Sequence, residues 1–108
     1  MYTHQHGGEW VYILNDSTPA ILAVAGVETL DKLVDNLGED AAAYPPCGII
    51  LLGDEEANKL PPEGVAVHKW SEFVAAGRSS ENEFTIADDP FALNTLIYTS
   101  GTTGNPKG

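Results

Sequence analysis

Two apolar stretches lack the alternation of apolar and polar positions that marks a strand with one exposed face. They span residues 21–25 (ILAVA) and 48–53 (GIILLG), and glycine bounds the second on both sides. Strands covered on both faces have this pattern, so we expect two buried strands. A shorter apolar stretch at 65–67 predicts a third strand, and residues 95–98 predict a fourth.

Residues 27–37 form the clearest helical pattern in the sequence. Four apolar residues recur at i, i+3, i+4 and i+7, namely Leu30, Leu33, Val34 and Leu37. Polar residues occupy the opposite face, and Gly38 follows where a C-cap glycine belongs. The spacing therefore predicts a helix with one face in the core.

Shorter patterns predict three further helices, at residues 9–16, 55–60 and 72–76. Ser71 precedes the last of them and is expected to be its N-cap, since a serine hydroxyl can accept from a free backbone N–H. Asp89 precedes a proline, which is typical of a helix start, so we expect one helical turn there.

Strands and helices alternate along the chain in this interpretation. Such alternation is typical of a parallel sheet, whose neighbouring strands need a crossover between them. We therefore predict an α/β fold, with a mostly parallel sheet and helices on both faces. Residues 1–108 contain no repeat and no long linker, so we expect them to belong to one domain.

The charge balance narrows the expected partners. Sixteen Asp and Glu residues against five Lys and Arg give a formal net charge of −11. Such a surface repels nucleic acid, so no nucleic-acid partner is expected. No apolar stretch approaches the ~20 residues of a membrane-spanning helix, so we expect no transmembrane segment. The single Cys47 cannot form an internal disulfide, which favours a cytoplasmic setting.

The candidate chemistry follows the fourth predicted strand. The sequence from Tyr98 to Gly108 is YTSGTTGNPKG, which combines hydroxyl side chains, glycines and a lysine. In parallel α/β sheets, ligands bind beyond the carboxyl ends of strands. Glycines let backbone N–H groups approach a ligand, while the hydroxyls add donors and Lys107 adds positive charge. The segment therefore suits a polyphosphate.

The segment differs from the P-loop pattern G-x-x-x-x-G-K-[ST]. Counting from Gly101 places Pro106 where the second glycine of that pattern belongs. On composition alone, a flexible linker is the alternative interpretation. Against a linker, the segment directly follows an apolar stretch and ends in Pro-Lys-Gly, not in more glycine and serine.

Residues 98–108 resemble the phosphate-binding loop of the adenylate-forming, or AMP-binding, superfamily. That superfamily includes acyl-CoA synthetases, adenylation domains of peptide synthetases and luciferases. All eleven residues match the pattern, in which the position of Asn105 is variable. Residues 88–97 also resemble the usual lead-in to that loop, and residues 12–17, followed by an apolar stretch, are more loosely similar to the long-chain acyl-CoA synthetase branch. The resemblance implies a partial N-terminal AMP-binding domain.

The resemblance implies a reaction in two steps. A carboxylic acid, here a fatty acid, attacks the α-phosphate of ATP held with Mg²⁺, giving an acyl-adenylate and pyrophosphate. Coenzyme A then displaces AMP to form a thioester. The same resemblance assigns the ATP phosphates to Thr99, Ser100, Gly101, Thr102, Thr103, Gly104 and Lys107. It makes Tyr98 the residue that aims the loop, with a mainly structural role.

Family members are several times longer, so we expect a fragment or a truncated gene product that is inactive alone. The resemblance places no catalytic residue in residues 1–108, and Lys107 is not the catalytic lysine of the family's smaller domain. His4 and His6 alternate without a third ligand, so no metal site is expected. Peripheral membrane association of the full enzyme stays open.

Two alternative functions remain open at this point. The first is another adenylating enzyme, such as an aryl-CoA ligase or an amino-acid-activating domain. The second is a non-catalytic α/β module that binds phosphate or a protein through the same loop.

Overall fold

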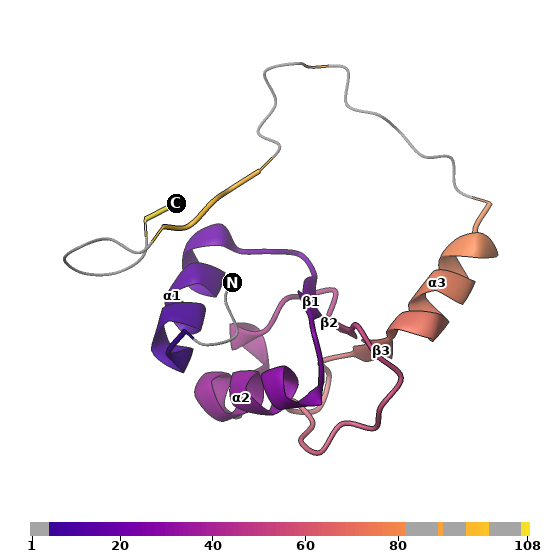
Figure 1. The fold of residues 1–108 in the computed structure, drawn as a ribbon, viewed down its shortest axis with the longest axis horizontal. Coiled ribbons are helices and arrows are strands. Elements are labelled where there is room, and N and C mark those ends of the chain that lie inside the picture. The colour runs from indigo at the N-terminus through magenta and orange to yellow at the C-terminus, as the bar shows by residue number, and fades with distance from the viewer. Residues whose placement is uncertain (1–4, 82–88, 90–94, 100–106) are drawn as a thin grey trace.

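The computed structural model describes residues 5–81, 89, 95–99 and 107–108. Helices and short strands alternate along the first of these ranges (Figure 1). In chain order the elements are α1 (Gly7–Ser17), β1 (Leu22–Val24), α2 (Val27–Leu37), the 3₁₀ turn η1 (Ala41–Ala43), β2 (Ile49–Leu51), β3 (Val67–Lys69) and α3 (Trp70–Arg78).

The three strands form one sheet in the order β1-β2-β3, and both pairings are parallel. Leu22 of β1 lies opposite Ile49 of β2, which in turn lies opposite Val67 of β3. Helix α2 and η1 lie on the crossover from β1 to β2. The predicted α/β class with a mostly parallel sheet is therefore confirmed.

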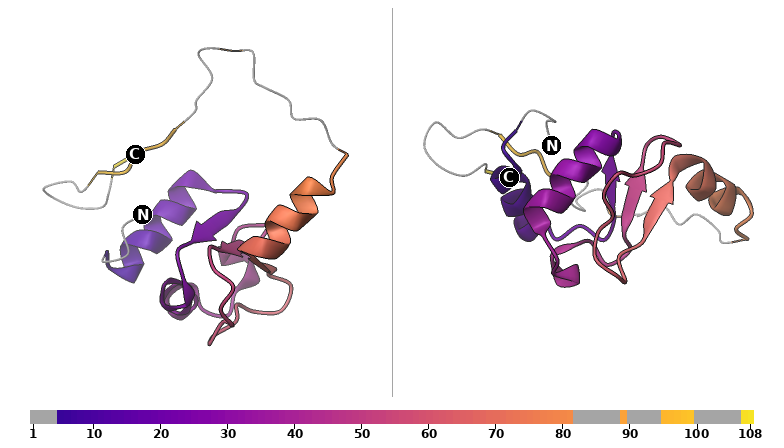
Figure 2. Two further views of the ribbon diagram at one scale, coloured as in Figure 1. Left: turned by 45° about the vertical axis from the view of Figure 1, so that its right-hand side comes forward. Right: turned by 90° about the horizontal axis from the view of Figure 1, so that it is seen from below.

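Helices flank the sheet at both ends of the strand order. Helices α1 and α2 pack against each other, and α2 contacts β1, whereas α3 contacts β3 and β2. Seen from below, α1 and α2 lie to the left of the strands and α3 lies to their right (Figure 2). Helices thus interleave with the parallel strands, as the alternating pattern predicts.

The core lies where α1, α2 and the sheet meet. The predicted apolar face of α2 is buried, because Leu30 and Leu33 are 0% and 1% exposed. Its partners are all buried. They come from α1, from the sheet and, in the case of Tyr44, from the end of η1: Trp10, Leu14, Val24, Tyr44, Ile49 and Leu51. Full burial of one such aliphatic side chain contributes about 1.5–3 kcal/mol.

Strand β1 is buried on one face only. Val24 is buried, whereas Ala23 is exposed and Leu22 is intermediate. Strand β2 is buried at all three positions, as its apolar sequence predicts. The expectation of burial on both faces is wrong for β1, because its Leu22 and Val24 face packs on the core whereas Ala23, on the opposite face, is exposed.

The predicted helix over residues 55–60 is wrong, because these residues form bends. Helix α2 holds them through Asp31, whose carboxylate accepts from the backbone N–H of Lys59 and the side-chain amide of Asn58, both at 3.0 Å. The ammonium of Lys59 also pairs with Asp35 at 2.6 Å. Side chains that satisfy backbone groups in this way compete with a local helix.

Strand β3 and helix α3 are displaced from their predicted positions. The strand begins at Val67 instead of 65, and the helix begins directly after it, with Lys69 as N-cap. Ser71 is therefore inside the helix, and the expected N-cap is wrong. Its hydroxyl donates instead to the carboxylate of Asp54 at 2.6 Å, so a contact distant in sequence replaces the local cap.

The predicted fourth strand is also wrong. Residues 95–98 form no strand, and Leu96 and Ile97 are 49% and 72% exposed. They have no register with β1, β2 or β3, whose pairings use the strands of the 5–81 region alone. The helical turn expected at Asp89 and the proline after it falls largely outside the described residues.

Candidate functional site

The structure describes the two ends of the predicted phosphate-binding segment, residues 98–108, called the phosphate loop from here on. Tyr98, Thr99, Lys107 and Gly108 are described. The remaining predicted phosphate-binding residues lie outside the described part: Ser100, Gly101, Thr102, Thr103 and Gly104. Their assignment to ATP stays a prediction.

Thr99 and Lys107 pair with each other in an isolated antiparallel bridge. The N–H of Thr99 donates to the carbonyl of Lys107 at 3.0 Å, and the N–H of Lys107 donates to the carbonyl of Thr99 at 3.1 Å. Two residues that exchange both bonds in this way form a hydrogen-bonded pair of an antiparallel ladder. It brings together the first and last of the predicted phosphate-binding residues.

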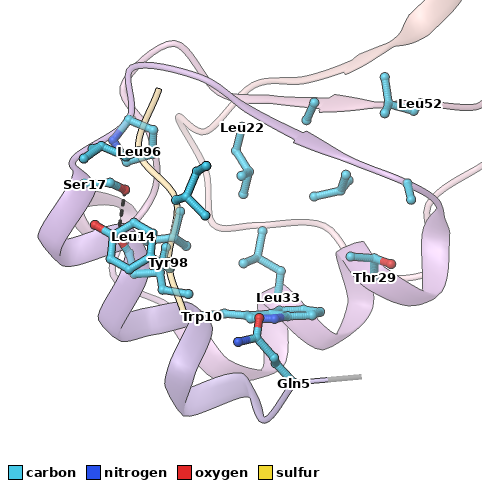
Figure 3. Close-up of a pocket in the computed structure, with 16 residues that line it drawn as sticks. Gln5, Trp10, Leu14, Ser17, Leu22, Thr29, Leu33, Leu52, Leu96 and Tyr98 are labelled. Carbon is cyan, nitrogen blue, oxygen red and sulfur yellow. Dashed lines mark hydrogen bonds between the residues drawn. The ribbon is translucent and has the colours of Figure 1, made fainter. Parts of the chain in front are cut away.

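Tyr98 joins the phosphate loop to α1. Its hydroxyl donates to a carboxylate oxygen of Asp16 at 2.6 Å. The close-up shows its ring lying alongside the last turns of α1, near Leu14 and Ser17 (Figure 3). Tyr98, which the resemblance makes the residue that aims the loop, thus has a hydrogen-bond partner on α1. The sequence did not indicate this partner.

Gly108 lies against the ring of Tyr98. A Cβ atom placed on this glycine would come within 2.7 Å of Cε1 and 2.8 Å of Cζ of the tyrosine. Real Cβ atoms do not approach that closely, so any larger residue would have to displace the ring. At its last position, therefore, the motif has room for a glycine alone unless the ring moves.

The Asp16 carboxylate also changes the titration of Tyr98. The hydrogen bond to Asp16 raises the pKa of Tyr98 above its usual value, and partial burial and the negative charge of Asp16 act in the same direction. A hydrogen bond with Ser17 opposes the shift. Ionisation would place a phenolate beside a carboxylate, so the pair favours the neutral phenol.

Lys107 presents its side chain to solvent. Within the part of the chain that the structure describes, the two salt bridges involve other lysines, Lys59 and Lys69. The ammonium of Lys107 is thus placed to meet an anion from solution. In a chain of net charge −11, this exposed ammonium makes the local charge positive.

A cavity of about 550 Å³ lies beside the phosphate loop, between α1, β1 and residues 96–98 (Figure 3). Most of its lining is apolar, with Trp10, Leu33 and Leu96 among the larger side chains, and Gln5 and Thr29 supply polar groups. Sequence reasoning missed this cavity because its residues come from distant segments. The exposed apolar pair Leu96–Ile97 borders it.

No metal centre is evident among the residues that the structure describes, where no three His, Cys, Asp or Glu side chains are grouped to hold an ion. His4, which is separated from His6 by one residue, lies outside the described residues. The helices in the described ranges are also too short or too polar to cross a bilayer, since the longest have 11 residues.

Comparison with known families assigns the whole chain to one family. The family model for the AMP-binding enzyme matches residues 1–108. The chain therefore belongs to the AMP-binding enzyme family, in agreement with the resemblance of the phosphate loop.

Curated relatives place the chain near one branch of that family. It is 46% identical over 54 residues to long chain acyl-CoA synthetase 5 of Arabidopsis thaliana, covering 50% of this chain and 8% of the relative. It is 35% identical over 102 residues to the peroxisomal long chain acyl-CoA synthetase 6 of the same plant, covering 90% of this chain and 14% of the relative.

A bacterial relative also matches most of this chain over a small part of its own length. The chain is 36% identical over 109 residues to the medium/long-chain-fatty-acid–CoA ligase FadD17 of Mycobacterium marinum, covering 90% of this chain and 22% of the relative. No solved structure matches the chain. The chain thus spans less than a quarter of the length of these curated relatives.

Proposed function

We propose that this chain supplies the ATP phosphate-binding loop of an AMP-forming acyl-CoA synthetase. In the whole enzyme, a fatty acid and ATP would give an acyl-adenylate and pyrophosphate, and coenzyme A would then release AMP. The single observation that best supports this role is the phosphate loop: its eleven residues fit the family pattern, and the Thr99–Lys107 bridge closes it. The fatty acid is proposed from the name of the bacterial relative, a medium/long-chain-fatty-acid–CoA ligase.

The residues present suit an anion better than a nucleoside. Lys107 is exposed beside a closed loop rich in hydroxyls and glycines, which is the donor set that a polyphosphate requires. ATP and pyrophosphate share that chemistry, whereas AMP offers a single phosphate. Mg²⁺ and coenzyme A belong to the proposal for the whole enzyme, as does a cytoplasmic location.

Isothermal calorimetry on the 108-residue chain tests this role. Pyrophosphate and ATP should bind more tightly than AMP, because the loop is expected to hold the β- and γ-phosphates. Lys107→Ala should weaken pyrophosphate binding roughly threefold to tenfold, as expected for loss of one solvent-exposed, charge-assisted contact. Arg78→Ala is the matched control, since it removes an exposed cation from the far end of α3.

Each result of this experiment discriminates between the functions considered. Equal loss of affinity in the Lys107 and Arg78 variants would indicate a general charge effect and contradict the loop assignment. Binding of AMP as tight as pyrophosphate would contradict it too. An absence of binding by all three ligands would favour the non-catalytic module that binds a protein through the loop. The chain alone should show no ATP-dependent thioester formation, because the proposal gives it the phosphate loop and no catalytic residue.

A further inference from the structure

Asp16 occupies an unfavourable position on its own helix. It lies in the last turn of α1, whose C-terminal end carries partial negative charge, and this turn contains no basic residue. A carboxylate there repels the helix dipole, so the stability of α1 does not explain it. The carboxylate instead accepts the hydroxyl of Tyr98 at 2.6 Å, a contact between residues 82 positions apart.

Tyr98 is the first residue of the phosphate loop, and its ring contacts the last. It directly precedes Thr99, and its ring lies against Gly108, which directly follows Lys107. Thr99 and Lys107 are themselves joined by two backbone hydrogen bonds. Whatever holds the Tyr98 ring therefore also holds the closed end of the loop.

We propose that Asp16 is a positioning residue for the phosphate loop, fixing the Thr99–Lys107 bridge on α1 through Tyr98. The phosphate ligand in this proposal rests on the proposed function, whereas the attachment of the loop to α1 does not. An O–H to carboxylate hydrogen bond of 2.6 Å falls in the short range of charge-assisted bonds, which are roughly twice as strong as neutral ones.

Charge and position predict opposite effects of removing Asp16. Asp16 adds a negative charge near a site proposed to bind an anion, so on charge alone its removal would tighten pyrophosphate binding. If Asp16 positions the loop, its removal weakens binding instead, because the donors lose their fixed arrangement. The sign of the change therefore separates the two roles.

The binding test compares three variants by calorimetry with pyrophosphate. Asp16→Ala should weaken binding roughly threefold to tenfold, the range that corresponds to loss of one ordinary hydrogen bond at the surface. Asp16→Asn keeps an acceptor oxygen and should restore most of the affinity. Glu63→Ala removes the same charge from an exposed loop and should leave binding unchanged or slightly tighter.

A second measurement needs no ligand. In the intact chain labelled with ¹³C at tyrosine Cζ, Tyr98 should deprotonate at a higher pH than free tyrosine, and in Asp16→Ala at a lower pH than in the intact chain. Hydrogen exchange at the amides of Thr99 and Lys107 should become faster in Asp16→Ala and stay near the original rate in Asp16→Asn. If Asp16→Ala does not fold, Tyr98→Phe replaces it, because it removes the same bond and keeps the ring.

The two measurements can fail separately. Unchanged exchange at Thr99 and Lys107 together with unchanged pyrophosphate affinity in Asp16→Ala would overturn the proposal, as would tighter binding like that of Glu63→Ala. If the intact chain binds no pyrophosphate but Asp16→Ala still exchanges faster, the attachment of the loop to α1 is supported and the proposed function fails.

Discussion

At the scale of single residues, two tyrosine hydroxyls form hydrogen bonds with residues that are not their neighbours in the sequence. Tyr98 donates to Asp16 on α1, and Tyr44 donates to the carbonyl of Gly38 at 2.9 Å. Gly38 is the C-cap of α2, with a positive φ of 71°. The Tyr44 hydroxyl thus satisfies a carbonyl at a helix end, where intrahelical partners are lacking.

Removal of the Tyr44 hydroxyl should lower stability in a pH-dependent way. Burial raises the pKa of Tyr44, and the Glu39 carboxylate adds to the shift. The folded state then holds the phenol proton more tightly than the unfolded state. The contribution of Tyr44 is therefore complete below its unfolded pKa near 10 and is lost as pH rises through the folded value.

Tyr44→Phe should thus cost about 1 kcal/mol of unfolding free energy near neutral pH, the usual net value of one hydrogen bond. Above pH 10 the two proteins should approach the same stability. Urea denaturation from pH 8 upward measures both curves. A difference that stays constant at all pH values would show that the Tyr44 phenol proton is not linked to folding.

At the scale of elements, the joint between β2 and β3 depends on Gly48. This residue has φ of 86°, in the left-handed region, and an added Cβ would lie 2.4 Å from the backbone carbonyl oxygen of Ala66. The same carbonyl accepts the N–H of Ile49 at 2.8 Å. A side chain at Gly48 would therefore both strain the backbone and disturb the start of the parallel pairing.

Gly48→Ala should destabilise the fold by roughly 1–3 kcal/mol, the usual cost of a residue forced into a strained backbone conformation. Gly77→Ala is the matched control with the opposite expected sign, because Gly77 lies in the last turn of α3 with nothing within 4 Å of an added Cβ. Within a helix, alanine is favoured over glycine by up to about 1 kcal/mol. Equal effects of the two substitutions on thermal unfolding would refute the strain argument.

The elements also show what the sequence could and could not predict. Helix α2 runs over Val27–Leu37 as predicted, because its apolar spacing and Gly38 are local signals. The bends at 55–60 were missed because Asp31 and Asp35 of α2 hold them. Residues 95–98 were wrongly expected to be a strand because apolar character alone does not supply a neighbouring strand.

The candidate site divides in the same way. Its residues could be identified from sequence because the phosphate loop is contiguous. The Thr99–Lys107 bridge, the Asp16 partner of Tyr98 and the adjacent cavity depend on tertiary contacts that no local pattern encodes. An acid in the last turn of a helix without a basic neighbour was the one available sign of Asp16, and it points to no particular partner.

At the scale of the whole molecule, negative charge dominates. The net charge is −11, and the salt bridges among the described residues are Lys59–Asp35, between two exposed side chains, and Lys69–Glu56, between a part-buried lysine and an exposed glutamate. Exposed pairs contribute about 0–1 kcal/mol each. Repulsion among the remaining acids is therefore expected to outweigh them at low ionic strength.

Salt should accordingly stabilise this protein. Raising sodium chloride from 0.01 to 0.15 M shortens the Debye length from about 30 to 8 Å, which screens repulsion across the surface. A gain of about 1 kcal/mol would raise the melting temperature by about 4–8 °C in a domain of this size. A Glu63→Lys, Glu81→Lys variant should respond less, and a melting temperature that falls with salt would show that the ion pairs dominate.

The two tryptophans lie in opposite surroundings, and this gives the protein two optical reporters. Trp10 is 2% exposed in the core beside α2, with the Lys32 ammonium 4.2 Å from its ring, whereas Trp70 is 48% exposed at the start of α3. A buried indole emits at shorter wavelength than a hydrated one. The emission spectrum therefore reports separately on the α1–α2 end and the α3 end of the sheet, so that loosening of one end can be distinguished from unfolding of both.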